Sequence, residues 1–133
     1  MRPLLLCLSL LVCAAPLAQP RLIQSGDILE GVLEAGDTVL ADDGSLYDLY
    51  VYQGAPNDEV VITLRSDDFD AFLIGGPTED DAFDLFEQDD DGAGGTDAEM
   101  VVTTNPSGEY FFLVNTYDPG QGGAYLVGAS PLR

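Results

Sequence analysis

The chain lacks several residue types on which enzymes and nucleic-acid-binding proteins commonly depend. Its 133 residues include no His, no Lys and no Trp, and only four Arg. Against these stand 24 Asp and Glu residues, which give a formal net charge of -20 at pH 7. This charge repels phosphate groups, so it argues against nucleic acid or an anionic membrane surface as a partner. It favours solubility and cationic ligands.

Cysteine is nearly absent, and both copies, Cys7 and Cys13, lie near the start of the chain. The apolar run 4–12 and the small residues up to Ala18 follow the order of a secretory signal peptide. The run is shorter than the roughly 20 residues that a membrane helix needs. We expect cleavage near Ala18, export to the periplasm or medium, and a mature chain without thiols or disulfides. A lipoprotein anchored through Cys13 is the alternative, but the preceding Val12 is bulky for that processing.

The missing side chains also limit catalysis. Without His or Cys in the mature chain, neither a Ser-His-Asp nor a Cys-His arrangement can form. A pair of carboxylates hydrolysing a glycoside remains as a weaker alternative. Since a chain of this size offers no evident substrate cleft, we expect a protein that is not an enzyme.

The mature chain predicts many short strands. The segments 28–33, 46–52, 60–64, 71–74, 83–86, 100–104, 110–115 and 124–127 are rich in β-branched and aromatic residues. Turn-forming residues separate them, and no window holds a helical apolar stripe. We therefore expect an all-β fold, an antiparallel two-sheet β-sandwich of jelly-roll type with about eight strands. The predicted organisation is a signal peptide at 1–18, a short segment at 19–26, one domain at 27–129 and a tail at 130–133.

Two strands indicate how the sheets are buried. In 46–52, alternation places Tyr47, Leu49 and Val51 on one face and Asp48, Tyr50 and Tyr52 on the other. We expect the first face to be core and the Asp48 face to meet water. The segment 110–114 is apolar on both faces, which predicts a strand in the middle of a sheet.

Six motifs in order make the mature chain resemble a known family. They are Gly31-Val32-Leu33 with Gly36-Asp37, then 47–52, 66–73, Asp89-Asp90-Asp91-Gly92, 108–115 and 123–126. The chain resembles bacterial pre-peptidase C-terminal domains, which are similar in fold to the collagen-binding modules of clostridial collagenases. The resemblance implies a β-sandwich module that accompanies secreted peptidases and other exported enzymes.

The resemblance also implies calcium. In the collagenase-like relatives, an Asp just before a Tyr pair and an acidic linker ahead of the first strand share the ion, and Asp48 matches the first position. Residues 19–25 contain no acidic side chain, so the second half of that site is missing here.

A different calcium site follows from strand pairing. If 71–74 and 83–86 form a hairpin closed by 75–81, Asp70 lies opposite Gln88 and Asp89. Two acidic clusters then meet at one end of the sheet: Asp67, Asp68 and Asp70 on one side, and Asp89, Asp90 and Asp91 on the other. Calcium takes about 6 to 8 oxygen ligands in such loops and would relieve the repulsion between them.

The acidic, glycine-rich loop 87–97 is better explained as a solvated surface turn than as a specific ion site, because charge runs commonly face water. It does not fit an EF-hand, since the twelfth position counted from Glu87 is Ala98 instead of Glu. A calcium-binding solenoid would need several stacked copies of the motif.

Tyr50, Tyr52, Tyr117 and Tyr125 are candidates for an exposed binding face, and the alternative is that they only cover the sheet.

Two functions follow for the whole chain. The first is a secreted non-catalytic module that binds an extracellular protein or polymer, or assists an exported peptidase. The second is a structural, envelope-associated acidic protein that binds calcium.

Overall fold

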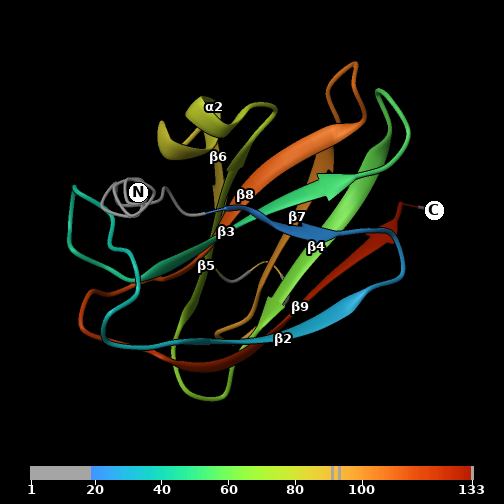
Figure 1. Cartoon of the computed structure of the whole chain (residues 1–133). Coiled ribbons are helices and arrows are strands. Elements are labelled where there is room, and N and C mark those ends of the chain that lie inside the picture. Colours follow the sequence, from blue (N-terminus) through green and yellow to red (C-terminus); the bar gives the residue numbers. More distant parts are fainter. Residues whose placement is uncertain (1–18, 91, 93, 133) are drawn as a thin grey trace, which may run out of the picture.

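The computed structural model describes residues 19–90, 92 and 94–132, which form a sandwich of two β-sheets (Figure 1). The five-stranded sheet contains, in spatial order, β1 (Arg21–Ile23), β3 (Tyr47–Gln53), β8 (Glu109–Thr116), β5 (Ala71–Gly76) and β6 (Glu87–Asp89). The four-stranded sheet contains β2 (Ile28–Leu33), β9 (Gly123–Pro131), β4 (Glu59–Arg65) and β7 (Ala98–Thr103). All neighbouring strands are antiparallel except β1, which is parallel to β3. The predicted two-sheet β-sandwich is confirmed.

Strand β8 lies at the centre of the five-stranded sheet, between β3 and β5. Phe112 and Val114 face the other sheet and Leu113 faces outward, yet all three are fully buried. A strand that is apolar on both faces must be covered on both sides. The prediction that 110–114 lies mid-sheet is therefore confirmed.

The main hydrophobic core fills the space between the sheets. Every second residue of the long strands points into it, as the two-residue period of a β-strand requires. The largest fully buried members are Tyr50, Tyr110, Phe112, Ile23, Leu33, Ile62, Leu64 and Leu73. Burying such side chains supplies most of the stabilisation of a chain that has no disulfide in its described part.

The assignment of faces in β3 from the sequence is wrong. Tyr50 and Tyr52 belong to the core between the sheets, and Asp48 lies on the same inner face. Leu49 points outward instead, into a second, smaller cluster with Ile74 and Leu113. A carboxylate normally marks the wet face of a strand, but here a buried hydroxyl from a distant strand provides it with a partner.

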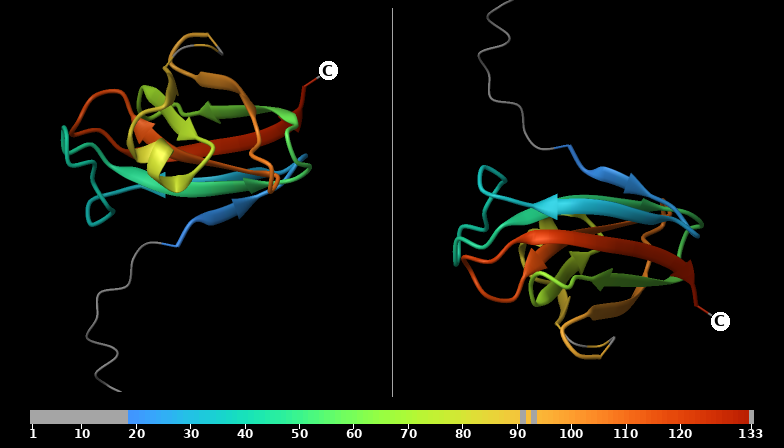
Figure 2. Two further views of the ribbon diagram at one scale, coloured as in Figure 1. Left: turned by 90° about the horizontal axis from the view of Figure 1, so that it is seen from above. Right: turned by 90° about the horizontal axis from the view of Figure 1, so that it is seen from below.

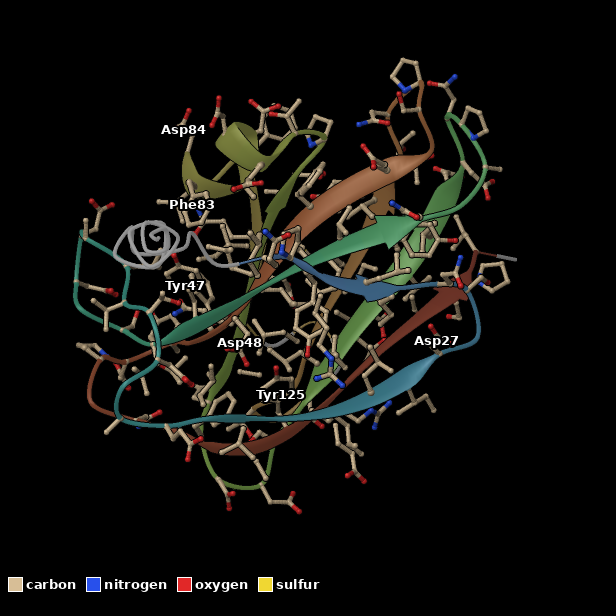
Figure 3. All side chains as sticks on the ribbon, in the orientation of Figure 1. Asp27, Tyr47, Asp48, Phe83, Asp84 and Tyr125 are labelled. Atoms are coloured by element: carbon tan, nitrogen blue, oxygen red, sulfur yellow. The ribbon has the colours of Figure 1, made fainter. Side chains whose placement is uncertain are left out.

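The second cluster is covered by a helix that the sequence did not predict. Residues 83–86 were expected to form a strand, but Phe83 is the last residue of helix α2 (Glu79–Phe83), and residues 84 and 85 form a turn ahead of β6. The Thr78 side chain accepts a hydrogen bond from the Asp81 amide, and three acidic residues fill the first turn, where the helix dipole favours negative charge. The Phe83 ring then packs edge-on against Tyr47, with ring centroids 5.4 Å apart (Figure 3).

The sheets extend beyond the expected domain limits of 27–129. Strand β1 lies in the segment that was expected to precede the domain, and β9 continues to Pro131. The predicted signal peptide, including Cys7, Cys13 and the cleavage position at Ala18, lies outside the described residues.

Candidate functional site

The structure does not bring the two predicted acidic clusters together as expected. Strand β5 pairs with β6 so that Leu73, and not Asp70, lies opposite Asp89. The register is displaced by three residues because the chain between the strands forms α2 instead of a tight hairpin. Within residues 19–90, 92 and 94–132, no group of three or more acidic side chains is arranged to hold a metal ion. Asp91 lies outside these residues, and calcium binding stays a prediction.

Asp89 has a structural partner instead. Its Oδ2 atom accepts hydrogen bonds from the Gly92 amide at 2.6 Å and from the Glu99 amide at 2.9 Å. Glu99 belongs to β7, an edge strand of the four-stranded sheet. The carboxylate therefore ties the acidic loop to that edge.

Asp68 and Asp70 form hydrogen bonds with residues elsewhere in the fold. Asp68 Oδ2 accepts a hydrogen bond from the Ala124 amide at 2.9 Å, which fixes the loop after β4 to the start of β9. The backbone carbonyl of Asp70 accepts from the Tyr117 amide at 2.8 Å. Asp67 is exposed, and Asp90 is partly exposed.

Asp48 is the predicted ligand that lies closest to the interior. It accepts a hydrogen bond from the Tyr125 hydroxyl at 2.6 Å, and that hydroxyl lies 2.7 Å from the hydroxyl of Tyr50 (Figure 3). Arg21 Nη1 donates to the Tyr50 hydroxyl at 3.1 Å and to the Glu30 carbonyl at 2.7 Å. This chain of polar groups crosses the sandwich from β9 to β1, and its Arg21 end reaches the edge strand β2 of the opposite sheet.

The environment shifts the pKa values of these groups. Burial raises the pKa of the Asp48 carboxyl above its ordinary 3.8, although the bond from Tyr125 works in the opposite direction. Burial also raises the pKa values of both Tyr50 and Tyr125, so both hydroxyls stay protonated at neutral pH and can donate. Tyr110, whose hydroxyl bonds to Glu87 at 2.5 Å, is raised for the same reason.

Gly31 makes room for this arrangement. A Cβ atom at Gly31 would collide with the ring and the hydroxyl of Tyr125. Glycine at this point of β2 therefore lets the Tyr125 side chain pass under the neighbouring strand to reach Asp48. The sequence motif Gly31-Val32-Leu33 thus has a packing reason.

The tyrosines expected on an exposed binding face are mostly interior. Tyr50, Tyr52 and Tyr125 are 0%, 3% and 3% exposed, so they cannot contact a partner, and the expectation is wrong for these three. Their rings bury large apolar areas between the sheets, and the hydroxyls of Tyr50 and Tyr125 find internal partners. Tyr117 is 50% exposed and packs edge-on against Phe72 on the five-stranded sheet.

The outer face of the four-stranded sheet is the surface that remains open. Viewed from above, α2 lies in front, whereas from below β2 and β9 lie in front, so the helix covers only the opposite sheet (Figure 2). In the described part of the chain, both buried clusters lie elsewhere, one between the sheets and one on the five-stranded sheet. Exposed apolar side chains on this open face are Ile28 and Val32 of β2, Leu126 of β9 and Val101 of β7.

Two adjoining hollows run along this face beside β9, and together we call them the β9 groove. The larger, of about 810 Å³, is lined by four carboxylates (Glu30, Asp67, Asp68 and Asp97) beside Val32 and Leu126, and we call it the acidic hollow. The smaller, of about 420 Å³, lies over Gly128 and Ser130 next to Ile28. Arg65 and Leu126 line both.

The residues of this groove were not predicted from the sequence. The alternation of Ile28, Glu30 and Val32 in β2 was a usable signal, because it places two large apolar side chains and one carboxylate on the same face. Arg65 was also distinctive, as one of only four cations in the chain. What the sequence did not reveal is which face of β2 would remain uncovered.

Comparisons with known proteins support the fold. No protein-family model and no curated protein matches the chain. Among solved structures, the pre-peptidase C-terminal domain of collagenase from Bacillus anthracis is similar, with a TM-score of 0.60 and 19% identity over 87% of this chain and 99% of that domain. In the described part of the chain, no helix is long and apolar enough to span a membrane.

Two periplasmic inhibitors of g-type lysozyme, both named PliG, also match. The Salmonella Typhimurium protein has a TM-score of 0.43 and 17% identity over 83% of this chain and 97% of its own. The Aeromonas hydrophila protein has a TM-score of 0.45 and 13% identity over 84% and 100%. The collagenase domain is the match that bears on the fold: the chain has the fold of a pre-peptidase C-terminal domain, as its sequence resemblance implied.

Proposed function

We propose that the protein is a secreted, non-catalytic binding module that attaches to an extracellular protein or polymer through the β9 groove. The uncovered outer face of the four-stranded sheet carries this proposal. Its exposed Ile28, Val32 and Leu126 flank a groove, whereas the equivalent face of the other sheet is covered by α2. Contiguous exposed apolar surface rimmed by polar groups commonly marks an interaction site.

Three further observations support the proposal. The first 18 residues have the composition of a signal peptide, which fits export. The fold is that of a domain found in a collagenase, which fits a module that works beside an exported peptidase. Absence of His and Cys beyond Cys13 in the sequence fits a non-catalytic role.

Retention of the purified protein on immobilised collagen, peptide and glycan surfaces tests the proposal. Val32→Ser and Leu126→Ser should abolish retention without changing the melting temperature by more than a few degrees, because both side chains are exposed. Val39→Ser is the matched control, since Val39 is 53% exposed but lies in the loop between β2 and β3. The proposal would be contradicted if the protein bound none of these surfaces, or if all three variants were retained equally.

A further inference from the structure

The β9 groove has the dimensions of an extended peptide. From Ala124 to Ser130 it follows six residue steps of β9, or about 20 Å at about 3.3 Å per residue. Its floor is low at Gly128, which has no side chain, and Ile28 and Thr63 flank that point from the neighbouring strands. The Leu126 side chain rises from β9 between the two hollows and lines both, so a segment lying along β9 would place side chains on either side of it. An extended segment of about six residues with apolar side chains on one face matches this shape.

Charge distinguishes the two ends of the groove. The acidic hollow gathers four carboxylates around one cation, Arg65, whereas the hollow over Gly128 has one carboxylate, Asp27, beside the same Arg65. Asp68 and Asp97 each accept a backbone hydrogen bond, at 2.9 Å and 3.2 Å. Within the described residues, the carboxylates of Glu30 and Asp67 have no hydrogen-bond or ion-pair partner. The end of the β9 groove at the acidic hollow therefore offers the carboxylates of Glu30 and Asp67 as hydrogen-bond acceptors for a positively charged group.

We infer that the β9 groove binds an extended protein segment with alternating apolar side chains and basic residues at the end that enters the acidic hollow. This inference rests on the proposed function and specifies the chemistry of its partner. The stem of an Arg or Lys would lie against Val32 and Leu126 while its charged end meets Glu30 and Asp67. The net charge of -20 also steers a cationic partner toward the protein and away from competing anions.

The probe is a fluorescently labelled peptide of alternating valine and serine with two arginines at one end. Two comparison peptides replace those arginines with two serines or two glutamates. Binding is followed by anisotropy at two salt concentrations. The arginine peptide should bind at least fivefold more tightly than the serine peptide, the glutamate peptide should bind most weakly, and added salt should reduce the difference.

Charge-matched variants separate local contacts from long-range attraction. Glu30→Gln with Asp67→Asn should weaken binding of the arginine peptide about fivefold. Asp42→Asn with Asp84→Asn removes the same charge from exposed positions near the other sheet, where Figure 3 places Asp84 beside Phe83, and should change the affinity less than about twofold. Equal weakening by both pairs would overturn the inference.

Gly128→Val and Arg65→Gln separate the remaining outcomes. A Cβ atom at Gly128 makes only ordinary contacts, at 3.5 Å and 3.7 Å, so valine should fill the groove without disturbing the fold and abolish binding of every peptide. If all three peptides bind equally well and Gly128→Val abolishes their binding, the basic-partner inference is overturned. The proposed function would still stand in that case. Preference for the glutamate peptide, lost in Arg65→Gln, would identify an anionic partner and overturn it as well. Binding unaffected by Gly128→Val, or no binding of any peptide, would refute the groove as the basic-peptide site, while retention on polymers tests the proposed function separately.

Discussion

Changing Tyr125 to Phe removes one oxygen atom from the interior and breaks two hydrogen bonds at once. The bond to the Asp48 carboxylate is 2.6 Å long, and the contact with the Tyr50 hydroxyl is 2.7 Å. A bond to a charged group contributes about 1.5–3 kcal/mol and a neutral one about 1 kcal/mol. Asp48 is partly exposed, so water replaces some of the loss, and we expect a decrease of about 1.5–3 kcal/mol in the free energy of unfolding. That corresponds to a melting temperature lower by roughly 6–12 °C for a domain of this size.

The effect should depend on pH, because burial raises the pKa of Asp48 in the folded state. Below that raised pKa the carboxyl is neutral, its bond from Tyr125 is weaker, and Tyr125→Phe should cost only about 1 kcal/mol. The sign for Asp48 itself follows from linkage. Between the unfolded value near 3.8 and the raised folded value, the folded state binds more protons, so the contribution of Asp48 to stability falls as pH rises and is constant above that interval.

Urea unfolding at pH 4 and pH 7 measures these differences for Tyr125→Phe, Asp48→Asn and the double variant. The double-mutant cycle should give a coupling of about 1–2 kcal/mol at pH 7. Tyr117→Phe is the control, since Tyr117 is half exposed and should lose less than about 0.5 kcal/mol. A loss below about 0.5 kcal/mol for Tyr125→Phe, or an equal loss with and without the Asp48 carboxylate, would show that the buried bond does not stabilise the fold.

Two further substitutions test the packing and the acidic loop. Gly31→Ala should lower the free energy of unfolding by about 1–3 kcal/mol, because its Cβ atom collides with Tyr125. Gly128→Ala on the neighbouring strand is the control and should lower it by less than about 1 kcal/mol. Comparable losses for the two variants in urea unfolding would contradict this prediction. Asp89→Ala should cost about 1–2 kcal/mol, because it leaves the Gly92 and Glu99 amides without their acceptor. Thermal melting of this variant should show the same loss in calcium and in EDTA at fixed ionic strength, whereas a loss seen only with calcium would support the predicted metal site.

Hydrophobic periodicity predicted the β-sandwich, because the formation of short strands depends mainly on the pattern of apolar and polar residues within each segment. Strand 28–33 has the predicted limits, and the centre of the five-stranded sheet was identified from a segment that is apolar on both faces. A sheet that buries both faces must be covered twice, and this requirement is visible in the sequence. The fold class therefore followed from residues near one another in the chain.

The errors came from contacts that join distant residues. Asp48 predicted a wet face because its partner, Tyr125, lies 77 residues away and no local pattern indicates the bond. Residues 83–86 were predicted as a strand because a run of four residues rich in apolar side chains is long enough to match a strand pattern. The capping residue Thr78, which marks the start of the helix, is a weaker signal in the sequence. The sequence shows the charge density of the acidic loop but not the backbone amides that bond to Asp89, so it missed the structural role of this carboxylate.

The contacts of Arg21 and Asp89 have a consequence for self-association. Each edge strand of the four-stranded sheet has one backbone group occupied by a charged side chain: Arg21 on the Glu30 carbonyl of β2, and Asp89 on the Glu99 amide of β7. An incoming strand from a second molecule would have to displace a guanidinium at one edge or a carboxylate at the other before it could pair. The protein can thus present an open sheet face to a partner while both margins of that sheet resist polymerisation into longer sheets.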